Sequence, residues 1–282
     1  MGEAEAARIA KSALEIATLP EVTIQIVQVV QDPRSTAHDL HKIVRNDPAL
    51  SSRVLRVVNS AFYGLPGQIG SIDRAIMLLG LNAVKNIAIA ASIGKMFKSS
   101  VICDDFSGKD LWTHSVAVGA TNKLLTTKIG LALPDEAFLA GLLHDIGLVA
   151  TMQCHTKELP KVVELAKGGM SFLKAEDEVI GANHQEIGAA LTKKWKFPRS
   201  FQYVNGYHHT PYLLAPENRL LSMVTFISDV MCSRAEIGLQ ITVETDEIPP
   251  EVLQEVGLTP EQIEEVSQNI ESELEAVRTL IM

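Results

Sequence analysis

The chain has 282 residues, of which 46% are hydrophobic and 21% are charged, and its mean hydropathy is +0.14. This composition can supply a large buried core, so it excludes a globally disordered chain. Aromatic residues make up only 5%, while Ala, Leu, Ile and Val dominate, which favours packed helices over the aromatic strands of sandwiches and barrels. We therefore expect an all-α fold.

The net charge of −9 comes mainly from the C-terminal segment. Glu244 to Met282 contains eleven acidic residues and one basic residue, Arg278, whereas the charges before it are nearly balanced. Neither part offers the basic stripe that binds a phosphate backbone. The sequence therefore argues against nucleic acid as a primary partner.

Three cysteines, Cys103, Cys154 and Cys232, lie far apart, and none belongs to a CxxC motif. Their odd number and spacing predict reduced, packed thiols, not a disulfide framework or a thiolate zinc site. The acidic N-terminus has no apolar run of signal length, and the apolar residues 87–93 fall far short of the roughly 20 that span a bilayer. We expect a cytoplasmic protein that does not bind membranes.

Apolar residues recur at helical spacing nearly throughout the chain. Residues 22–30 are ambiguous, because their β-branched side chains favour a strand by propensity alone, but we interpret them as a helix. Asp47 and Pro48 form a typical helix start, with an N-cap followed by Pro at the first position, and Ser71 is a similar cap. The helices predicted in this first part cover residues 22–30, 36–45, 48–60, 72–79 and 81–97.

The last helix begins at Thr259-Pro260, where Thr259 and Gln262 have the spacing of a capping box. Its apolar residues form one narrow stripe opposite an acidic face, so the helix either docks on the body or binds a partner or a second copy. The stripe consists of Ile263, Val266, Ile270, Leu274, Val277 and Ile281. Before it, helices are predicted at residues 109–128, 134–153 and 216–229, with shorter ones between glycine and proline breaks at residues 168–169, 181 and 198.

Five of the eight histidines occur in an ordered series with two aspartates. The series is His114, His144, Asp145, His184, His208, His209 and Asp229. The HDIG sequence at residues 144–147 lies in an otherwise apolar stretch, where an unpaired polar pair would cost about 1–3 kcal/mol or more. On a helix, neighbouring side chains project about 100° apart, so both could reach one ion. We therefore predict a metal site, and we leave His38, His41 and His155 as ordinary surface or hydrogen-bonded residues.

Mixed imidazole and carboxylate ligands suit iron, manganese, zinc or nickel more than calcium, and we expect iron first. One bridging carboxylate would make the site dinuclear. In that arrangement His144, Asp145 and Asp229 hold metal, Asp145 bridges two divalent ions, and the other histidines of the series complete the two sites. Asp110 lies four residues before His114 on the same helical face, so it is either a further ligand or a group that supports one.

The segment DPALSSRVLRVVNSAFYG, followed by SIDRAIMLLG, resembles the signature of the HDOD family, bacterial regulatory relatives of the HD phosphohydrolases. The resemblance covers about residues 12–212 and implies two packed helical subdomains in an HD-domain-like bundle, with a helix at residues 22–30. It divides the chain into an HDOD domain at 12–215 and a helical extension at 216–282, which completes the HD site with Asp229. Many members have lost the metal ligands and are regarded as signalling modules.

The ordered ligands resemble those of the HD-GYP branch, which are metal-dependent phosphodiesterases of cyclic di-GMP. Asp110 occupies a place where that branch can carry a carboxylate ligand. Two features differ: the lysine of the branch's HDIGK motif, which helps to bind substrate phosphate, is Leu148 here, and the sequence TPYL at residues 210–213 replaces the glycine-rich GYP motif. These differences predict that cyclic di-GMP is not hydrolysed.

Two functions remain open at this point. The resemblance favours a bacterial signal-transduction module that keeps a dinuclear metal site and binds a signalling protein partner. The alternative is a metal-dependent phosphohydrolase that binds a small phosphorylated ligand, a nucleotide or another phosphodiester. Asp145 would be its catalytic residue.

Overall fold

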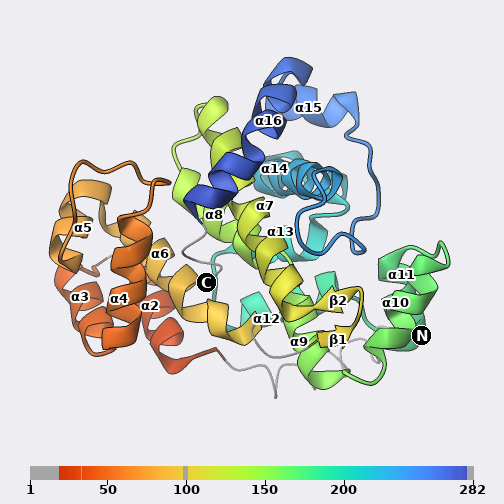
Figure 1. Ribbon diagram of the computed structural model, residues 1–282, viewed down its shortest axis with the longest axis horizontal. Coiled ribbons are helices and arrows are strands. Elements are labelled where there is room, and N and C mark those ends of the chain that lie inside the picture. Colours follow the sequence, from red (N-terminus) through yellow and green to blue (C-terminus); the bar gives the residue numbers. More distant parts are fainter. Residues whose placement is uncertain (1–18, 33, 98–100, 278–282) are drawn as a thin grey trace.

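The computed structural model describes residues 19–32, 34–97 and 101–277, so the first residues of the expected domain and Ile281 of the last apolar stripe lie outside it. The described residues form helices and one short hairpin, which confirms the all-α fold (Figure 1). The first part contains α2 (Glu21–Gln31), α3 (Ala37–Arg45), α4 (Pro48–Val58), α5 (Ile72–Leu79), α6 (Leu81–Ile93) and the 3-10 helix η1 (Gly94–Phe97).

The second part begins with an unpredicted two-stranded hairpin, β1 (Val101–Cys103) and β2 (Phe106–Ser107), whose strands pair antiparallel. The elements that follow are α7 (Gly108–Lys128), α8 (Pro134–Leu143), α9 (Ile146–Cys154), α10 (Leu159–Lys167), α11 (Phe172–Val179), α12 (His184–Lys194), α13 (Arg199–Tyr207), the 3-10 helix η2 (Pro211–Leu213), α14 (Pro216–Arg234), α15 (Pro250–Val256) and α16 (Pro260–Ala276).

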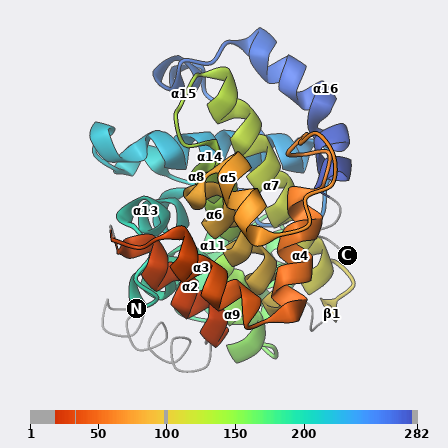
Figure 2. The same ribbon diagram turned by 90° about the vertical axis from the view of Figure 1, so that its left-hand side faces the viewer.

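Helix α6 joins the two parts. The helices α2–α5 gather on one side of the molecule, and the helices from α7 onward gather on the other (Figures 1 and 2). Ten of the 13 residues of α6 are buried, because the helix packs on α2, α4 and α5 and also on α8. One hydrophobic core therefore runs through both parts, as expected for two packed helical subdomains.

Helix α7 is the central element of the second part, since α8, α14 and α16 all pack on it. Two glycines allow its close crossing with α8. A Cβ atom at Gly119 would lie 2.7 Å from the Phe138 carbonyl oxygen, and one at Gly141 would lie 2.8 Å from the Gly119 Cα atom. Any larger side chain would force the two backbones apart.

The prediction of a single helix over residues 134–153 is wrong. The structure has two helices, α8 and α9, and His144 and Asp145 form the turn between them. The turn is tight because the Leu148 amide donates to the Asp145 carbonyl oxygen three residues earlier, at 3.0 Å. Although the stretch Pro134–Cys154 is long and apolar enough to cross a membrane, 89% of its most apolar window is buried inside the molecule, as in a core helix.

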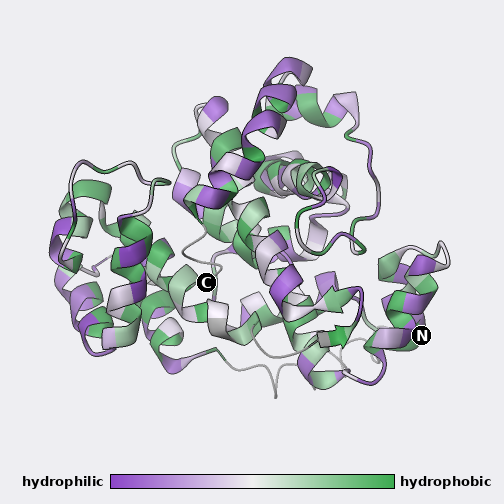
Figure 3. Ribbon diagram, viewed as in Figure 1, coloured by the Kyte–Doolittle hydropathy of each residue, from purple (hydrophilic) through white to green (hydrophobic). Residues whose placement is uncertain are grey.

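Both ends of the predicted helix series form as expected. Residues 22–30 are helical in α2, and α16 starts with the capping box of Thr259 and Gln262. The α16 side chains Ile263, Val266 and Ile270 are buried in the core that this helix shares with α7 and α14. Of the two alternatives for the last helix, the structure therefore has it docked on the body, with its hydrophilic face outward (Figure 3).

Candidate metal centre

The seven side chains of the predicted ligand series lie together, and all are buried; the most exposed is His209, at 6%. They form two groups, and within each group the potential ligand atoms lie within 4.8 Å of one another. The four-residue group consists of Asp145, His184, His208 and His209. The three-residue group consists of His114, His144 and Asp229. We refer to the seven residues as the metal centre.

Five elements bring these residues together. His114 lies on α7 and Asp229 on α14, while His144 and Asp145 form the turn between α8 and α9. The start of α12 and the end of α13 supply the remaining histidines. Helices α9 and α12 cross at Gly147, where a Cβ atom would lie only 2.0 Å from the His184 carbonyl oxygen. This glycine therefore allows α12 to bring its first residue against the HD turn.

Three of the five histidine rings share one orientation pattern. The Nδ1 atom of His144 lies 2.7 Å from the Gly141 carbonyl oxygen, and that of His208 lies 3.1 Å from the Val204 carbonyl oxygen. His114 Nδ1 is likewise 3.3 Å from a backbone carbonyl oxygen. A carbonyl only accepts, so each Nδ1 carries the proton and donates, which leaves the lone pair of a neutral ring on Nε2. This is the tautomer that binds a metal through Nε2.

Several buried polar atoms in the centre have no hydrogen-bond partner among the residues that the structure describes. They include Nε2 of His144, Nε2 of His208 and both carboxylate oxygens of Asp145. Burying such atoms without a partner costs about 1–3 kcal/mol each, and more when they carry charge. A cation held among them would supply the missing interactions, so this donor set fits a metal.

Asp145 faces both groups. Its Oδ2 atom lies 3.3 Å from His144 Nε2, while its Oδ1 atom lies 3.5 Å from His184 Nε2 and 3.4 Å from His208 Nε2. Asp229 is placed similarly, with Oδ1 2.9 Å from Nε2 of His114 and Oδ2 3.7 Å from the ring of the last histidine in the series. Two carboxylates therefore lie between the two groups of imidazoles.

The electrostatics favour the metal-binding protonation states for Asp145, His208 and His209. Burial acts to raise the pKa of Asp145, but the surrounding imidazoles, His144 foremost, hold it well below its usual range. Burial also lowers the pKa of His208 and, with the neighbouring rings, holds that of His209 well below its usual range. Burial acts to lower the pKa values of His144 and His184, but neighbouring carboxylates raise both, that of His184 to about 9. An ionised carboxylate and neutral imidazoles are the forms that coordinate cations.

Glu176 belongs to the site, and we did not predict it. Its fully buried Oε2 atom accepts from the Nδ1 atom of His184 at 2.6 Å and from the backbone amide of the same residue at 3.0 Å. Burial raises the pKa of this carboxyl, although His184 acts to lower it. The sequence feature that could have identified Glu176 is its position on the apolar face of α11, one turn after Phe172 and one turn before Val179.

Asp110 does not reach the metal centre. Its exposed carboxylate accepts a hydrogen bond from the Ser107 hydroxyl at 2.5 Å, and Ser107 in turn caps the Asp110 amide. The residue stabilises the start of α7 because a negative charge is favourable at a helix N-terminus. The expectation that it ligates metal is therefore not supported by its position.

The other residues considered from the sequence lie elsewhere. His41 pairs with Asp73 at 3.0 Å on the surface, and His155 lies 4.0 Å from a glutamate on its own turn. Leu148 is completely buried in the core.

Residues 16–211 match the HDOD domain family. The chain belongs to this family. A protein of Treponema pallidum (strain Nichols), described as uncharacterized, is 27% identical over 280 residues. These residues are 97% of this chain but 52% of the relative, so the HDOD protein spans about half of that relative's length.

Solved structures share the HDOD fold. An HDOD domain protein of unknown function from Geobacter sulfurreducens matches with a TM-score of 0.82 and 24% identity, over 97% of this chain and 98% of that one. A candidate phosphohydrolase from Shewanella amazonensis SB2B matches with a TM-score of 0.75 and 23% identity, over 98% of each chain. A candidate signal transduction protein from Marinobacter aquaeolei VT8 matches with a TM-score of 0.74 and 22% identity, over 95% of this chain and 60% of that one.

Proposed function

We propose that this HDOD protein is a cytoplasmic bacterial signal-transduction module whose metal centre holds two divalent transition-metal ions. The observation that carries the proposal is the set of buried, unpartnered atoms at His144, Asp145 and His208, since the two imidazole nitrogens lie 3.3 and 3.4 Å from the Asp145 carboxylate. Imidazole nitrogens and carboxylate oxygens together suit iron first, with manganese, zinc or nickel as alternatives.

In this proposal each group of side chains holds one ion. Asp145 bridges the two ions, since its two oxygens face different groups, and His144 and Asp229 hold metal with it. The remaining four histidines complete the two sites. Glu176 acts through His184 by fixing its tautomer and the direction of its Nε2 atom.

The closure of the centre supports a regulatory role over a catalytic one. No residue of the seven is more than 6% exposed, so a phosphoester could reach the ions only if the helices moved apart. Leu148, which stands where a phosphate-binding lysine would be expected, is buried and uncharged. The likeness to a candidate signal transduction protein is consistent with this context.

A metal-dependent phosphohydrolase is the second candidate. Two carboxylates lying between two imidazole groups form the donor set that such enzymes use, and one structural neighbour is described as a candidate metal-dependent phosphohydrolase. Paired ions would polarise a phosphoryl oxygen and activate water, with Asp145 as the catalytic residue. A nucleotide or other phosphodiester would then be the substrate.

We further propose that the functional unit combines the HDOD domain, residues 12–215, with the extension at 216–282. The extension carries Asp229, whose carboxylate lies 2.9 Å from the His114 ring of the HDOD domain. A signalling protein would be the partner of this unit.

The metal content of the purified protein distinguishes these two proposals from the alternative that the HDOD domain binds no metal. Protein purified without chelator should contain transition metal, and the same sample should be tested on a panel of phosphodiesters and nucleotides. Full metal occupancy without hydrolysis supports the signalling module. Hydrolysis that is lost in Asp145→Ala supports the phosphohydrolase.

A further inference from the structure

A second candidate site lies among the helices that carry the metal centre. It is a cavity of about 510 Å³ between α7, α8, α13 and α14, within the size range of small-molecule pockets. Within the described part of the chain, no residue of the metal centre lines it. The cavity is therefore a separate site.

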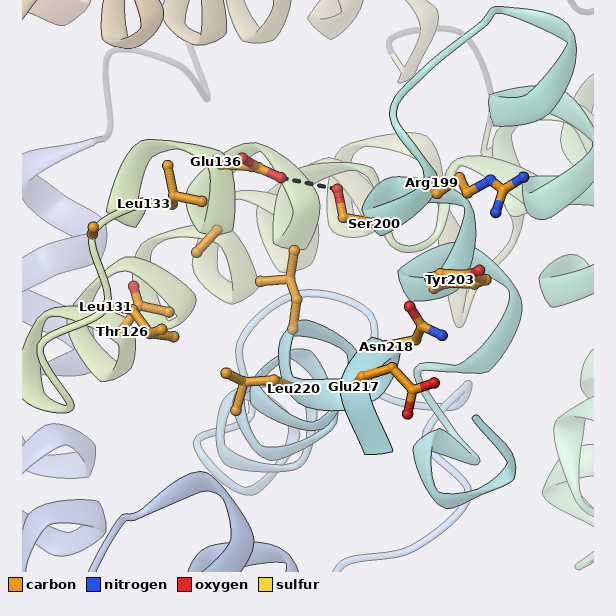
Figure 4. Close-up of a pocket in the computed structure, with 13 residues that line it drawn as sticks. Thr126, Leu131, Leu133, Glu136, Arg199, Ser200, Tyr203, Glu217, Asn218 and Leu220 are labelled. Atoms are coloured by element: carbon orange, nitrogen blue, oxygen red, sulfur yellow. Dashed lines mark hydrogen bonds between the residues drawn. The ribbon is translucent and has the colours of Figure 1, made fainter. Parts of the chain in front are cut away.

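The cavity has an apolar side and a polar side. Leu131, Leu133 and Leu220 lie on one side, and Arg199 and Glu217 lie on the other (Figure 4). Leu133 is 59% exposed, although leucine is an apolar side chain that normally avoids water. An amphipathic ligand would cover these leucines with its apolar body and place its head against the charged side chains.

The charges on the polar side restrict the head group. Arg199 and Glu217 are exposed, and neither has an ion-pair partner among the residues that the structure describes. Glu136, the other acid of the lining, already accepts a hydrogen bond from Ser200 at 2.9 Å. A purely anionic head would be repelled by Glu217 and a purely cationic one by Arg199, whereas a zwitterionic head could pair with both.

The cavity is close to the metal centre along α8 and α13. On α8, Ala137 lines the cavity seven residues before His144, which is about 10 Å along the helix axis. On α13, Tyr203 lines it five residues before His208, or about 7.5 Å. A ligand that shifts these helices would therefore act directly on the elements that position the metal ligands.

One buried residue connects the two sites. Asn122 of α7 is fully buried, and its Nδ2 atom donates to the Ala137 carbonyl oxygen and to the Thr225 hydroxyl, each at 3.0 Å. The Thr225 hydroxyl donates in turn to the carbonyl oxygen of Leu221, which lines the cavity. Asn122 also packs against Gly141, since a Cβ atom there would lie 2.6 Å from Nδ2.

The same glycine completes the connection to the metal centre. The Gly141 carbonyl oxygen accepts from the His144 ring at 2.7 Å. A continuous series of contacts thus runs from the cavity wall through Asn122 and Gly141 to a proposed metal ligand. The Oδ1 atom of Asn122 has no hydrogen-bond partner, so this side chain is held by fewer bonds than it could make.

We propose that this cavity binds a small amphipathic molecule with a zwitterionic head, and that its occupancy changes how tightly the metal centre holds its ions. The first half of the proposal, that the cavity binds this ligand, depends on the cavity alone. The second half, that ligand binding changes metal retention, rests on the proposed metal function. Together they would make the HDOD protein a sensor in which a small molecule is the input and the state of the metal centre is the output.

Three probes, each with ten carbons in its chain, test the first half of the proposal by titration calorimetry below their critical micelle concentrations. Decylphosphocholine should bind at least about tenfold more tightly than decanoate or decyltrimethylammonium. Ser200→Trp, which fills the cavity from a half-buried position, should weaken binding about tenfold or more, whereas Lys193→Trp on the exposed face of α12 should not change it. Absence of binding, equal binding to both tryptophan variants, or tighter binding of a singly charged probe would overturn the assignment.

The rate of metal loss to a coloured chelator tests the second half. Saturating decylphosphocholine should change this rate about fivefold or more in the wild type. Thr225→Val keeps the side-chain volume but removes the hydrogen bond to Asn122, so it should retain probe binding and lose most of this effect. Thr127→Val, at an exposed position on the same helix as Asn122, is the control.

An unchanged rate of metal loss in probe-saturated wild type, or an equal response in both valine variants, would overturn the coupling. If the purified protein holds no metal, the proposed function fails while the probe titrations still decide the cavity. The two failures are therefore distinguishable.

Discussion

Glu176 Oε2 lies 2.6 Å from His184 Nδ1, and both side chains are completely buried. The same carboxylate also accepts from the His184 backbone amide, so it fixes both the ring and the start of α12. A carboxylate behind a histidine in this way raises the basicity of the other ring nitrogen and aims it at a metal. Glu176 is thus a positioning residue for the proposed metal centre.

Glu176→Gln should weaken metal binding about 10- to 100-fold, because the amide oxygen is a poorer acceptor for the His184 ring than a carboxylate. The dissociation constant for added metal, measured by competition with a chelator, checks this. Asp177→Asn is the control, since the exposed Asp177 carboxylate accepts only from Asn183, at 3.2 Å, within the described part of the chain. Equal metal affinity in the two variants would contradict the role given to Glu176.

His144→Ala should remove metal and lower the free energy of unfolding by about 1–3 kcal/mol, because the buried Asp145 carboxylate would lose its nearest partner. Thermal unfolding of both proteins, with and without chelator, is the measurement. Chelator should lower the melting temperature of the wild type and have little effect on the variant. If chelator lowered the melting temperature of the variant as much as that of the wild type, His144 would not be a ligand of the ion.

Gly147→Ala should destabilise the protein by about 1–3 kcal/mol or more and reduce metal affinity, because the added methyl group would press on the His184 carbonyl oxygen and separate α9 from α12. Gly70→Ala is a matched control, since a Cβ atom there meets nothing within 4 Å. Denaturant unfolding with metal titration measures both effects. If Gly147→Ala behaved like the control, the close crossing of α9 and α12 would be wrong.

The Cys232 thiol should be unreactive in the folded protein at pH 8, since burial raises its pKa to about 12. Because the folded pKa lies above the unfolded value of 9.0, the thiol contributes stability below pH 9 that is lost as the pH rises from about 9 to 12. Ellman's reagent should label the partly exposed Cys103 and Cys154 in the native protein and Cys232 only on unfolding. Rapid labelling of three thiols in native protein would contradict this burial.

The order of helices and the ligand series could be predicted because both leave local signals. Asp47-Pro48 and the Thr259–Gln262 capping box mark helix starts directly in the sequence, and the structure has helices there. His144 and Asp145 were conspicuous because they interrupt an apolar stretch, and the remaining ligands because they form an ordered series of histidines with Asp229. Residues 22–30 were harder to interpret because propensity alone favoured a strand, and the family resemblance supported the helix that the structure has there.

Other features depend on tertiary packing and leave no local signal. The break between α8 and α9 lies inside a continuous apolar run, so periodicity gave one helix, while the HD turn is set by the crossing with α12 at Gly147. The hairpin of β1 and β2 is too short to show alternation. The spacing from Asp110 to His114 indicates a shared helical face, but it does not indicate whether the Asp110 side chain reaches the same site.

If the protein has a regulatory role, it should lack one enzymatic activity. The protein should not hydrolyse cyclic di-GMP at an enzyme-like rate even with metal bound, because Leu148 is buried in the core and supplies no charge to the phosphodiester. Product formation followed by chromatography is the assay. Turnover above about 1 per second that is lost in Asp145→Ala would replace the signalling role with a phosphodiesterase.

Metal content tests the central claim most directly. Elemental analysis of protein purified without chelator should find about two transition-metal ions per chain, and Asp145→Ala, which removes the proposed bridge, should lose most of both. One ion per chain would contradict the paired site, and metal-free protein that binds none of the added iron, manganese, zinc or nickel would contradict the metal centre itself.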